Sequence, residues 1–481
     1  MSDRPNIVFI LTDQQRYDSI RALGFPHVDT PNLDRLVNEG TSFDRTYVTA
    51  PSCSPSRASL FSGTYPHTNG VFRNDEAWNY CWVQSLNSTG YHCVNVGKMH
   101  TWPVEGAFGF HERHVTENKD RAHPNLPFYL DNWDKAIWSQ GYEKPSRQTY
   151  RHLPDYSERL GSFIWELPKN LHPDVFVPQT ACMWLDRYTG EEPFFLQVGI
   201  PGPHPPYDPL QSYLDRYEDR ELPMPIRDYD LDSQPKPIRE LRRNHLDNDH
   251  DAVVHLENPT DEQMRRQRAH YYANVTMIDE QVGQIVEALE RRGVLENTII
   301  IFSSDHGDCL NDHGHSQKWN MYEQSVHVPA ILWGPGIPAG RRISDLVSLM
   351  DLGPTILELG GVEPPSWMEA QSLCPYFRDT PPPRRDCVFA EHASDAILTG
   401  TAFISMVLVG DWKLVHFIDS DEGQLFDLSS DPGERRNRWD DPECVDKKNQ
   451  LVGRLLTWRI ESDIKTQTFR NALSGTESRR A

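Results

Sequence analysis

The chain contains the stretch Cys53-Ser54-Pro55-Ser56-Arg57-Ala58-Ser59-Leu60-Phe61-Ser62-Gly63, which follows a strand-like run that ends near Thr49. A proline in the first turn and a glycine after the last turn are typical helix boundaries. The pattern predicts that Cys53 and Arg57 lie at the start of a helix, where backbone N–H groups and the helix dipole favour anions. The stretch therefore indicates an oxyanion site.

This stretch closely resembles the C-x-P-S-R-x-x-L-x-x-G signature of type I sulfatases, with Phe61 a departure from the usual leucine. The resemblance extends from Asn6 to about Pro432, which makes a chance thiol before a helix the weaker interpretation. It implies an α/β fold of the alkaline phosphatase type, with a large mixed sheet sandwiched by helices. A smaller C-terminal lobe of antiparallel strands plus a helix is expected to follow.

The composition limits the partners of the protein. The 48 basic and 70 acidic side chains among 481 residues give a net charge of −22, which disfavours nucleic acid and anionic membranes. An anionic substrate would have to be attracted by a local cluster of cations and a metal. The eight cysteines form no C-x-x-C pair, which argues against a disulfide framework or a structural zinc site.

Two lobes are expected, a catalytic domain over 1–380 and a small C-terminal lobe over 381–481, with the prolines at 381–383 as a stiff connector. The first apolar run, Ile7 to Leu11, is too short to span a membrane and lacks a signal-peptide cleavage site. We therefore expect a cytoplasmic protein. The polar C-terminal tail weakly favours a homo-oligomer, a dimer or a tetramer.

Two buried strands end in residues that suit a metal ion. The run Asn6 to Leu11 leads into Asp13 and Gln14, and the run Thr298 to Ser303 leads into Asp305 and His306. Open α/β sheets place ligands at the carboxyl ends of strands, although an acid there can also cap the next helix. The resemblance implies one divalent ion bound by Asp13, Gln14, Cys53, Asp305 and His306. A histidine nitrogen favours manganese, with calcium as the alternative.

Further polar residues follow other strands or loops. Lys98 and His100 follow the strand-like run Tyr91 to Val96, and an extended backbone would place them on the same side. They resemble the sulfatase G-K-x-H element, which implies contacts to the sulfate oxygens. His204, in a proline-rich loop after the run Phe194 to Ile200, resembles a sulfatase active-site histidine.

The resemblance also assigns Lys318 to the sulfate and the leaving group, and Asn74 to the substrate site, where an ordinary turn residue is equally compatible. His313 and His315 are interpreted as solvated loop residues. The segment 102–193 is expected to be an insertion that walls the pocket, and 208–258 a long surface excursion.

The resemblance implies that Cys53 is oxidised to formylglycine by a maturation enzyme and that the aldehyde hydrate is the nucleophile. One hydroxyl attacks sulfur, and the other expels sulfate as the carbonyl re-forms. Arg57 and Lys98 would orient the hydrate and the sulfate, and His100 would remove the proton that triggers collapse. His204 and Lys318 would stabilise or protonate the leaving oxygen. The expected substrates are small aryl or alkyl sulfate esters.

Three alternatives remain. A phosphonate monoester or phosphodiester hydrolase would use the same nucleophile and metal, and the C-terminal helix and tail resemble that branch, whereas Ser56, Lys98 and His100 do not. A thiolate phosphatase has five residues between its cysteine and arginine, whereas three separate Cys53 from Arg57. A noncatalytic anion-binding protein would have lost the nucleophile or the metal residues, and all of them are present.

Overall fold

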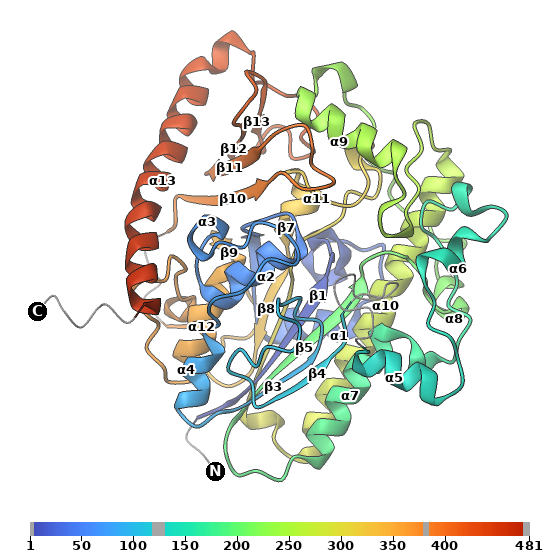
Figure 1. The fold of residues 1–481 in the computed structure, drawn as a ribbon, viewed down its shortest axis with the longest axis vertical. Coiled ribbons are helices and arrows are strands. Elements are labelled where there is room, and N and C mark those ends of the chain that lie inside the picture. The colour runs from blue at the N-terminus through green and yellow to red at the C-terminus, as the bar shows by residue number, and fades with distance from the viewer. Residues whose placement is uncertain (1–3, 118–129, 379–383, 475–481) are drawn as a thin grey trace, which may run out of the picture.

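The computed structural model describes residues 4–117, 130–378 and 384–474. A nine-stranded mixed sheet forms the centre of the fold (Figure 1). Its middle strand, β1 (Asn6–Asp13), pairs in parallel with β5 (Phe194–Pro203) and β6 (Thr298–Ser304). The remaining strands are β2 (Thr41–Tyr47), β3 (His92–Gly97), β4 (Glu112–Val115), β7 (His327–Val328), β8 (Ala330–Trp333) and β9 (Arg341–Ser348).

Helices cover both faces of this sheet because β1 carries apolar side chains on both of its faces. Phe9 belongs to a core with Phe61, on the face covered by α2 (Cys53–Ser62), α4 (Val83–Ser88) and α12 (Leu352–Leu359). Val8 belongs to the opposite core with Val282, beneath α1 (Pro31–Glu39), α7 (Pro173–Arg187) and α10 (Asp261–Arg292). The predicted sandwich of helices around a large mixed sheet is confirmed.

A second, antiparallel sheet forms the C-terminal lobe, beside which α13 (Val445–Leu473) runs along one edge of the molecule (Figure 1). Its strands are β10 (Cys387–Ala393), β11 (Phe403–Val409), β12 (Trp412–Phe417) and β13 (Gly423–Asp427). The buried Lys413 of β12 lies 2.8 Å from Glu323 of the first lobe and also pairs with Glu434. Since a buried ammonium needs carboxylate partners, this cluster ties the two lobes together.

The predicted connector at 381–383, and with it the boundary between 380 and 381, lies outside the described residues, so the division into two domains stays a prediction. The expectation that 208–258 is a surface excursion is wrong for its helix α9 (Lys236–Asp247), because Leu241 and His245 are buried. No helix in the described part of the chain combines the length and the apolar character that a membrane span requires.

Candidate active site

Two acidic residues meet at the carboxyl ends of β1 and β6. The parallel register pairs Thr12 with Ser304, so Asp13 and Asp305 leave adjacent strands at the same level. His306 follows at once, and its Nε2 lies 3.5 Å from Asp13 Oδ1 and 3.6 Å from Asp305 Oδ1. All three side chains are fully buried.

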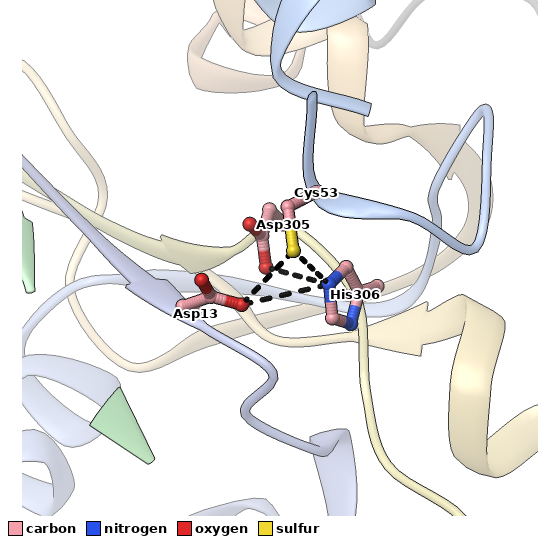
Figure 2. Close-up of side chains that lie close together, drawn as sticks. All are labelled: Asp13, Cys53, Asp305 and His306. Atoms are coloured by element: carbon pink, nitrogen blue, oxygen red, sulfur yellow. Dashed lines mark hydrogen bonds and ion pairs between the residues drawn. The ribbon is translucent and has the colours of Figure 1, made fainter. Parts of the chain in front are cut away.

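Helix α2 brings Cys53 to the same point (Figure 2). The Sγ atom lies 3.2 Å from His306 Nε2 and 3.6 Å from Asp13 Oδ1. The hydroxyl of Ser56 donates a hydrogen bond of 2.6 Å to the carbonyl of Asp305, which fixes the first turn of α2 against the end of β6. The sequence-predicted helix start and the two strand ends therefore form one site.

Three cations surround this cluster. Arg57 Nε donates to Asp305 Oδ2 at 2.7 Å, and its Nη1 donates to the carbonyl of Lys98 at 2.8 Å. The ammonium of Lys98 pairs with Asp13 Oδ2. Lys318 Nζ lies 3.0 Å from Cys53 Sγ. Each cation is buried, so its pairing with a carboxylate or with the thiol is weakly screened.

Neighbouring cations keep Asp13 ionised, and burial keeps His306 neutral. Burial alone would raise the pKa of Asp13, but Lys98 together with His204, Lys318 and His306 holds it well below its usual range. Burial lowers the pKa of His306 to about 4. His306 Nδ1 donates to the carbonyl of Gly307 at 3.0 Å, since a carbonyl can only accept. The Nε2 lone pair therefore faces the carboxylates.

The donor set fits a divalent cation. One atom each of Asp13, Cys53, Asp305 and His306 lies within 4.8 Å of the other three. Two carboxylate oxygens and an imidazole lone pair that face one another repel unless a positive charge lies between them, and oxygen and nitrogen together are ligands of first-row divalent metals.

The unmodified thiol of Cys53 is a poor nucleophile in this setting. Burial and the neighbouring charge of Asp13 raise its pKa to about 11, against the opposing effect of Lys318. Because the thiolate rather than the thiol attacks, burial and the charge of Asp13 disfavour a thiolate mechanism at neutral pH.

The remaining predicted residues lie at or beside the cluster. Gln14 is buried, and its Oε1 accepts from Lys318 at 2.8 Å while its Nε2 donates to Asp308 at 2.7 Å. Asn74 Oδ1 accepts from the backbone N–H of Ser54 at 3.3 Å, in the first turn of α2. The pKa of His204 lies well below its usual range, mainly because the ring is buried. The charge of Lys318 lowers this pKa further, and that of Asp13 raises it.

The extended geometry that we predicted for Lys98 and His100 is wrong. Gly97, the last residue of β3, has φ +92°, and His100 has φ +60°, so both residues are left-handed and the segment between them is not a regular extension of the strand. Lys98 enters the cluster, whereas His100 is joined to the start of α2 through its carbonyl, which accepts from the hydroxyl of Ser54 at 3.2 Å.

His313 and His315 are also placed differently from the prediction. Neither side chain is solvated, because both residues are fully buried. The ring of His313 stacks on Tyr322 with its centroid 4.0 Å away. Both histidines therefore contribute to packing beneath the loop that carries Lys318.

Sequence reasoning missed two acidic residues. Glu117 is half-buried, its Oε1 accepts from the backbone N–H of His100 at 3.2 Å, and the charges of Lys98 and Arg57 act on its carboxylate. Asp251 lies with one carboxylate oxygen 3.8 Å from His204 Nε2. Glu117 follows the short strand β4, whose sequence ERHV has no apolar strand pattern, and Asp251 lies in a segment without regular periodicity, so the sequence did not mark either position.

Residues 5–362 match the family model described as "Sulfatase", which covers most of the chain. The chain belongs to the sulfatase family. Residues 311–461 of this sulfatase also match the C-terminal model of N-sulphoglucosamine sulphohydrolase. Membership makes the chain a sulfuric ester hydrolase and confirms the resemblance carried by the Cys53 stretch.

Two relatives match nearly the whole sulfatase chain. An arylsulfatase of Clostridium perfringens is 31% identical over 466 residues, 93% of each chain. A choline-sulfatase of Rhizobium meliloti is 29% identical, over 91% of this chain and 83% of that protein.

Two solved structures share the fold of the sulfatase. A phosphonate monoester hydrolase of Agrobacterium radiobacter has a TM-score of 0.79 at 24% identity, over 95% of this chain and 96% of the other. A protein in complex with its substrate D-glucosamine-2-N,6-O-disulfate has a TM-score of 0.78 at 23% identity, over 97% of this chain and 99% of the other.

The site predicts that Asp13→Asn weakens divalent metal binding at least about tenfold, because it removes one charged ligand while keeping the side-chain shape. Manganese bound per chain after dialysis, measured by atomic emission, checks this. Asp279→Asn is the control, because that buried carboxylate instead caps α1 by accepting from the backbone N–H of Leu33 at 2.7 Å. Equal manganese binding by wild type and Asp13→Asn would contradict the site.

Proposed function

We propose that this sulfatase hydrolyses small aryl or alkyl sulfate esters to an alcohol or phenol and inorganic sulfate, with formylglycine made from Cys53 as the nucleophile. The observation that carries the proposal is the position of Cys53 Sγ, within 3.0–3.6 Å of Lys318 Nζ, His306 Nε2 and Asp13 Oδ1. An aldehyde hydrate at this position supplies one hydroxyl for attack on sulfur and a second for release of sulfate.

The proposed metal ligands are Asp13, Gln14, Asp305 and His306 together with residue 53. A divalent ion bound there supplies Lewis-acid polarisation and lowers the pKa of a bound hydroxyl. His306 adds nitrogen to an otherwise oxygen-rich set, which favours manganese over calcium. The neutral state of His306 supports this assignment, since only an unprotonated imidazole nitrogen binds a metal.

The three cations are assigned to the sulfate group. Arg57 Nη2 is buried and makes no hydrogen bond within the described protein, so it can donate to a sulfate oxygen. Lys98 holds Asp13 in place and contributes charge for the nonbridging oxygens. Lys318 contacts residue 53 directly and is assigned to the oxygens shared by sulfate and leaving group.

Two histidines are assigned to proton transfer, and Asn74 to the substrate. His204 would protonate the departing oxygen together with Lys318, and its burial among charged residues supports a place in the site. His100 would remove the proton that triggers release of sulfate; its link to Ser54 keeps it beside the start of α2. Asn74 holds the backbone of the same turn and would contact the substrate from there.

The proposal also includes a maturation enzyme as a partner and a cellular location. A maturation enzyme must oxidise Cys53. Because Cys53 is buried in the folded chain, we expect the enzyme to act on the chain before it has folded completely. The cytoplasmic location stays a prediction from the sequence.

A homo-oligomer is supported by one face of α13. Four large apolar side chains on it, Val452, Leu456, Ile460 and Ile464, are 39% to 67% exposed and recur every fourth residue. Such a stripe on one long helix is typical of an interface with another helix, and a second copy of the chain supplies an identical stripe.

Cys53→Ala is expected to reduce hydrolysis of 4-nitrophenyl sulfate to the background rate, because the nucleophile is lost, while the melting temperature stays within a few degrees. Cys374→Ala removes another buried thiol and should remain active. A peptide mass spectrum across residue 53 of the active enzyme should show the aldehyde. Activity retained by Cys53→Ala would show that residue 53 is not the nucleophile.

The alternative, a phosphonate monoester hydrolase, is tested by comparing kcat/KM for 4-nitrophenyl sulfate and 4-nitrophenyl phenylphosphonate. We expect the sulfate to be favoured at least about tenfold, which corresponds to ~1.4 kcal/mol of transition-state stabilisation. Lys98→Met should reduce this preference. A higher kcat/KM for the phosphonate would instead favour the alternative.

The oligomer is tested with Leu456→Glu combined with Ile460→Glu, which places two charges on the stripe. Sedimentation velocity should give a dimer or tetramer for the wild type and a monomer for the double variant, with unchanged circular dichroism. Gln450→Glu, an exposed change outside the stripe, should leave the oligomer intact. A monomeric wild type at micromolar concentration would refute the proposal.

A further inference from the structure

Two arginines on one short helix hold a turn that reaches the active site. Arg147 and Arg151 lie one turn apart on α6 (Arg147–Arg151). Arg147 Nη2 pairs with Asp251 Oδ1, and Arg151 Nε donates to Asp249 Oδ2 at 2.7 Å. The two ion pairs fix two alternate residues of the same turn.

The backbone of this turn is held in an unfavourable conformation. Asp251 has φ +54° and Ala252 has φ +61°, a left-handed conformation that side chains with a Cβ rarely adopt. Ala252 is fully buried in a small core with Phe163 and Tyr150, and Tyr150 is also on α6. Such strain, of about 1–3 kcal/mol per residue, persists only where the surroundings determine it, and it is concentrated at functional sites.

The turn directs the carboxylate of Asp251 toward His204. His204 Nδ1 lies 2.7 Å from the carbonyl oxygen of Pro205 and donates to it. Nε2 is therefore the nitrogen available for the substrate, and it lies 3.8 Å from Asp251 Oδ2. His204 is 6% exposed and Asp251 is 9% exposed, so water screens their interaction only weakly.

We propose that Asp251 is a positioning residue that orients His204 and stabilises its imidazolium form, and that Arg147 holds Asp251 in place. The inference rests on the proposed role of His204. As the sulfur–oxygen bond of the ester breaks, its electron pair goes to the leaving oxygen, and the Nε2 proton of the imidazolium moves to that oxygen. His204 becomes neutral and keeps its Nδ1 proton, and no proton moves to Asp251.

Burial and several neighbouring charges act on the imidazolium form of His204 in opposite directions. Burial and the nearby cations Lys318 and Lys98 lower the pKa of His204, whereas Asp13 and Asp251 raise it. Asp13 is also paired with Lys98 and faces the metal-binding cluster. Asp251 is therefore the carboxylate that favours the imidazolium from the side of the leaving group.

The proposal predicts a dependence on the leaving group. Nitrophenolate departs readily without a proton, whereas the phenolate of phenyl sulfate benefits from protonation in the transition state. Loss of Asp251 should therefore slow the two esters to different extents, which a purely structural role would not do.

The experiment measures kcat/KM for phenyl sulfate and 4-nitrophenyl sulfate in the full-length, formylglycine-containing enzyme. Asp251→Asn should lower the value for phenyl sulfate about 10- to 100-fold and that for 4-nitrophenyl sulfate less than about threefold. Asp249→Asn is the matched control, because Asp249 is held by the same helix without facing His204, and it should leave the ratio unchanged. Arg147→Gln should shift the ratio in the same direction as Asp251→Asn, and Arg151→Gln should not.

Equal losses for both esters in Asp251→Asn, or the same shift of the ratio in Asp249→Asn, would overturn the inference. In a His204→Ala background, adding Asp251→Asn should cause no further selective loss. If the wild type hydrolyses neither sulfate ester, the proposed function fails. If it hydrolyses both but Asp251→Asn leaves their ratio unchanged, the inference alone fails.

Discussion

The parallel pairing of β1 with β6 is the constraint on which the site depends. It brings two acidic side chains, Asp13 and Asp305, from positions nearly 300 residues apart to one buried point. Buried like charges are unfavourable unless cations compensate them, and Lys98 and Arg57 do so from two other segments. The sheet thus determines where the acidic side chains lie, and their charges determine where the cations lie.

The same constraint explains why Cys53 is buried although it begins a helix. Three hydrogen bonds hold the first turn of α2. Ser56 donates to the carbonyl of Asp305, which follows β6, and Ser54 donates to Asn74 and to the carbonyl of His100. The nucleophile proposed at this position would lose little orientational freedom on substrate binding. Its position is a property of the packed core rather than of a mobile loop.

Sequence reasoning located the parts of the site that lie at ends of regular elements. Asp13, Asp305 and Cys53 follow or begin segments with strong apolar patterns, so their positions could be predicted from strand and helix boundaries. Asp251 and Glu117 could not be predicted in this way, because tertiary contacts of irregular segments place them. The extended backbone predicted for Lys98 and His100 was wrong, because the left-handed conformations of Gly97 and His100 leave no trace in the apolar periodicity.

The local charge at the site is opposite to that of the whole protein. The chain carries −22, which repels anions at long range, yet three buried cations face two carboxylates around Cys53 among the described residues. A divalent ion would make this excess of positive charge larger. Since the surrounding protein screens these charges weakly, the cluster can compensate the charge of a sulfate monoester that loses its hydration shell. The charge of the ester is therefore matched locally, by cations that the segments after β3 and β6 and the first turn of α2 bring to residue 53, and not by the charge of the whole protein.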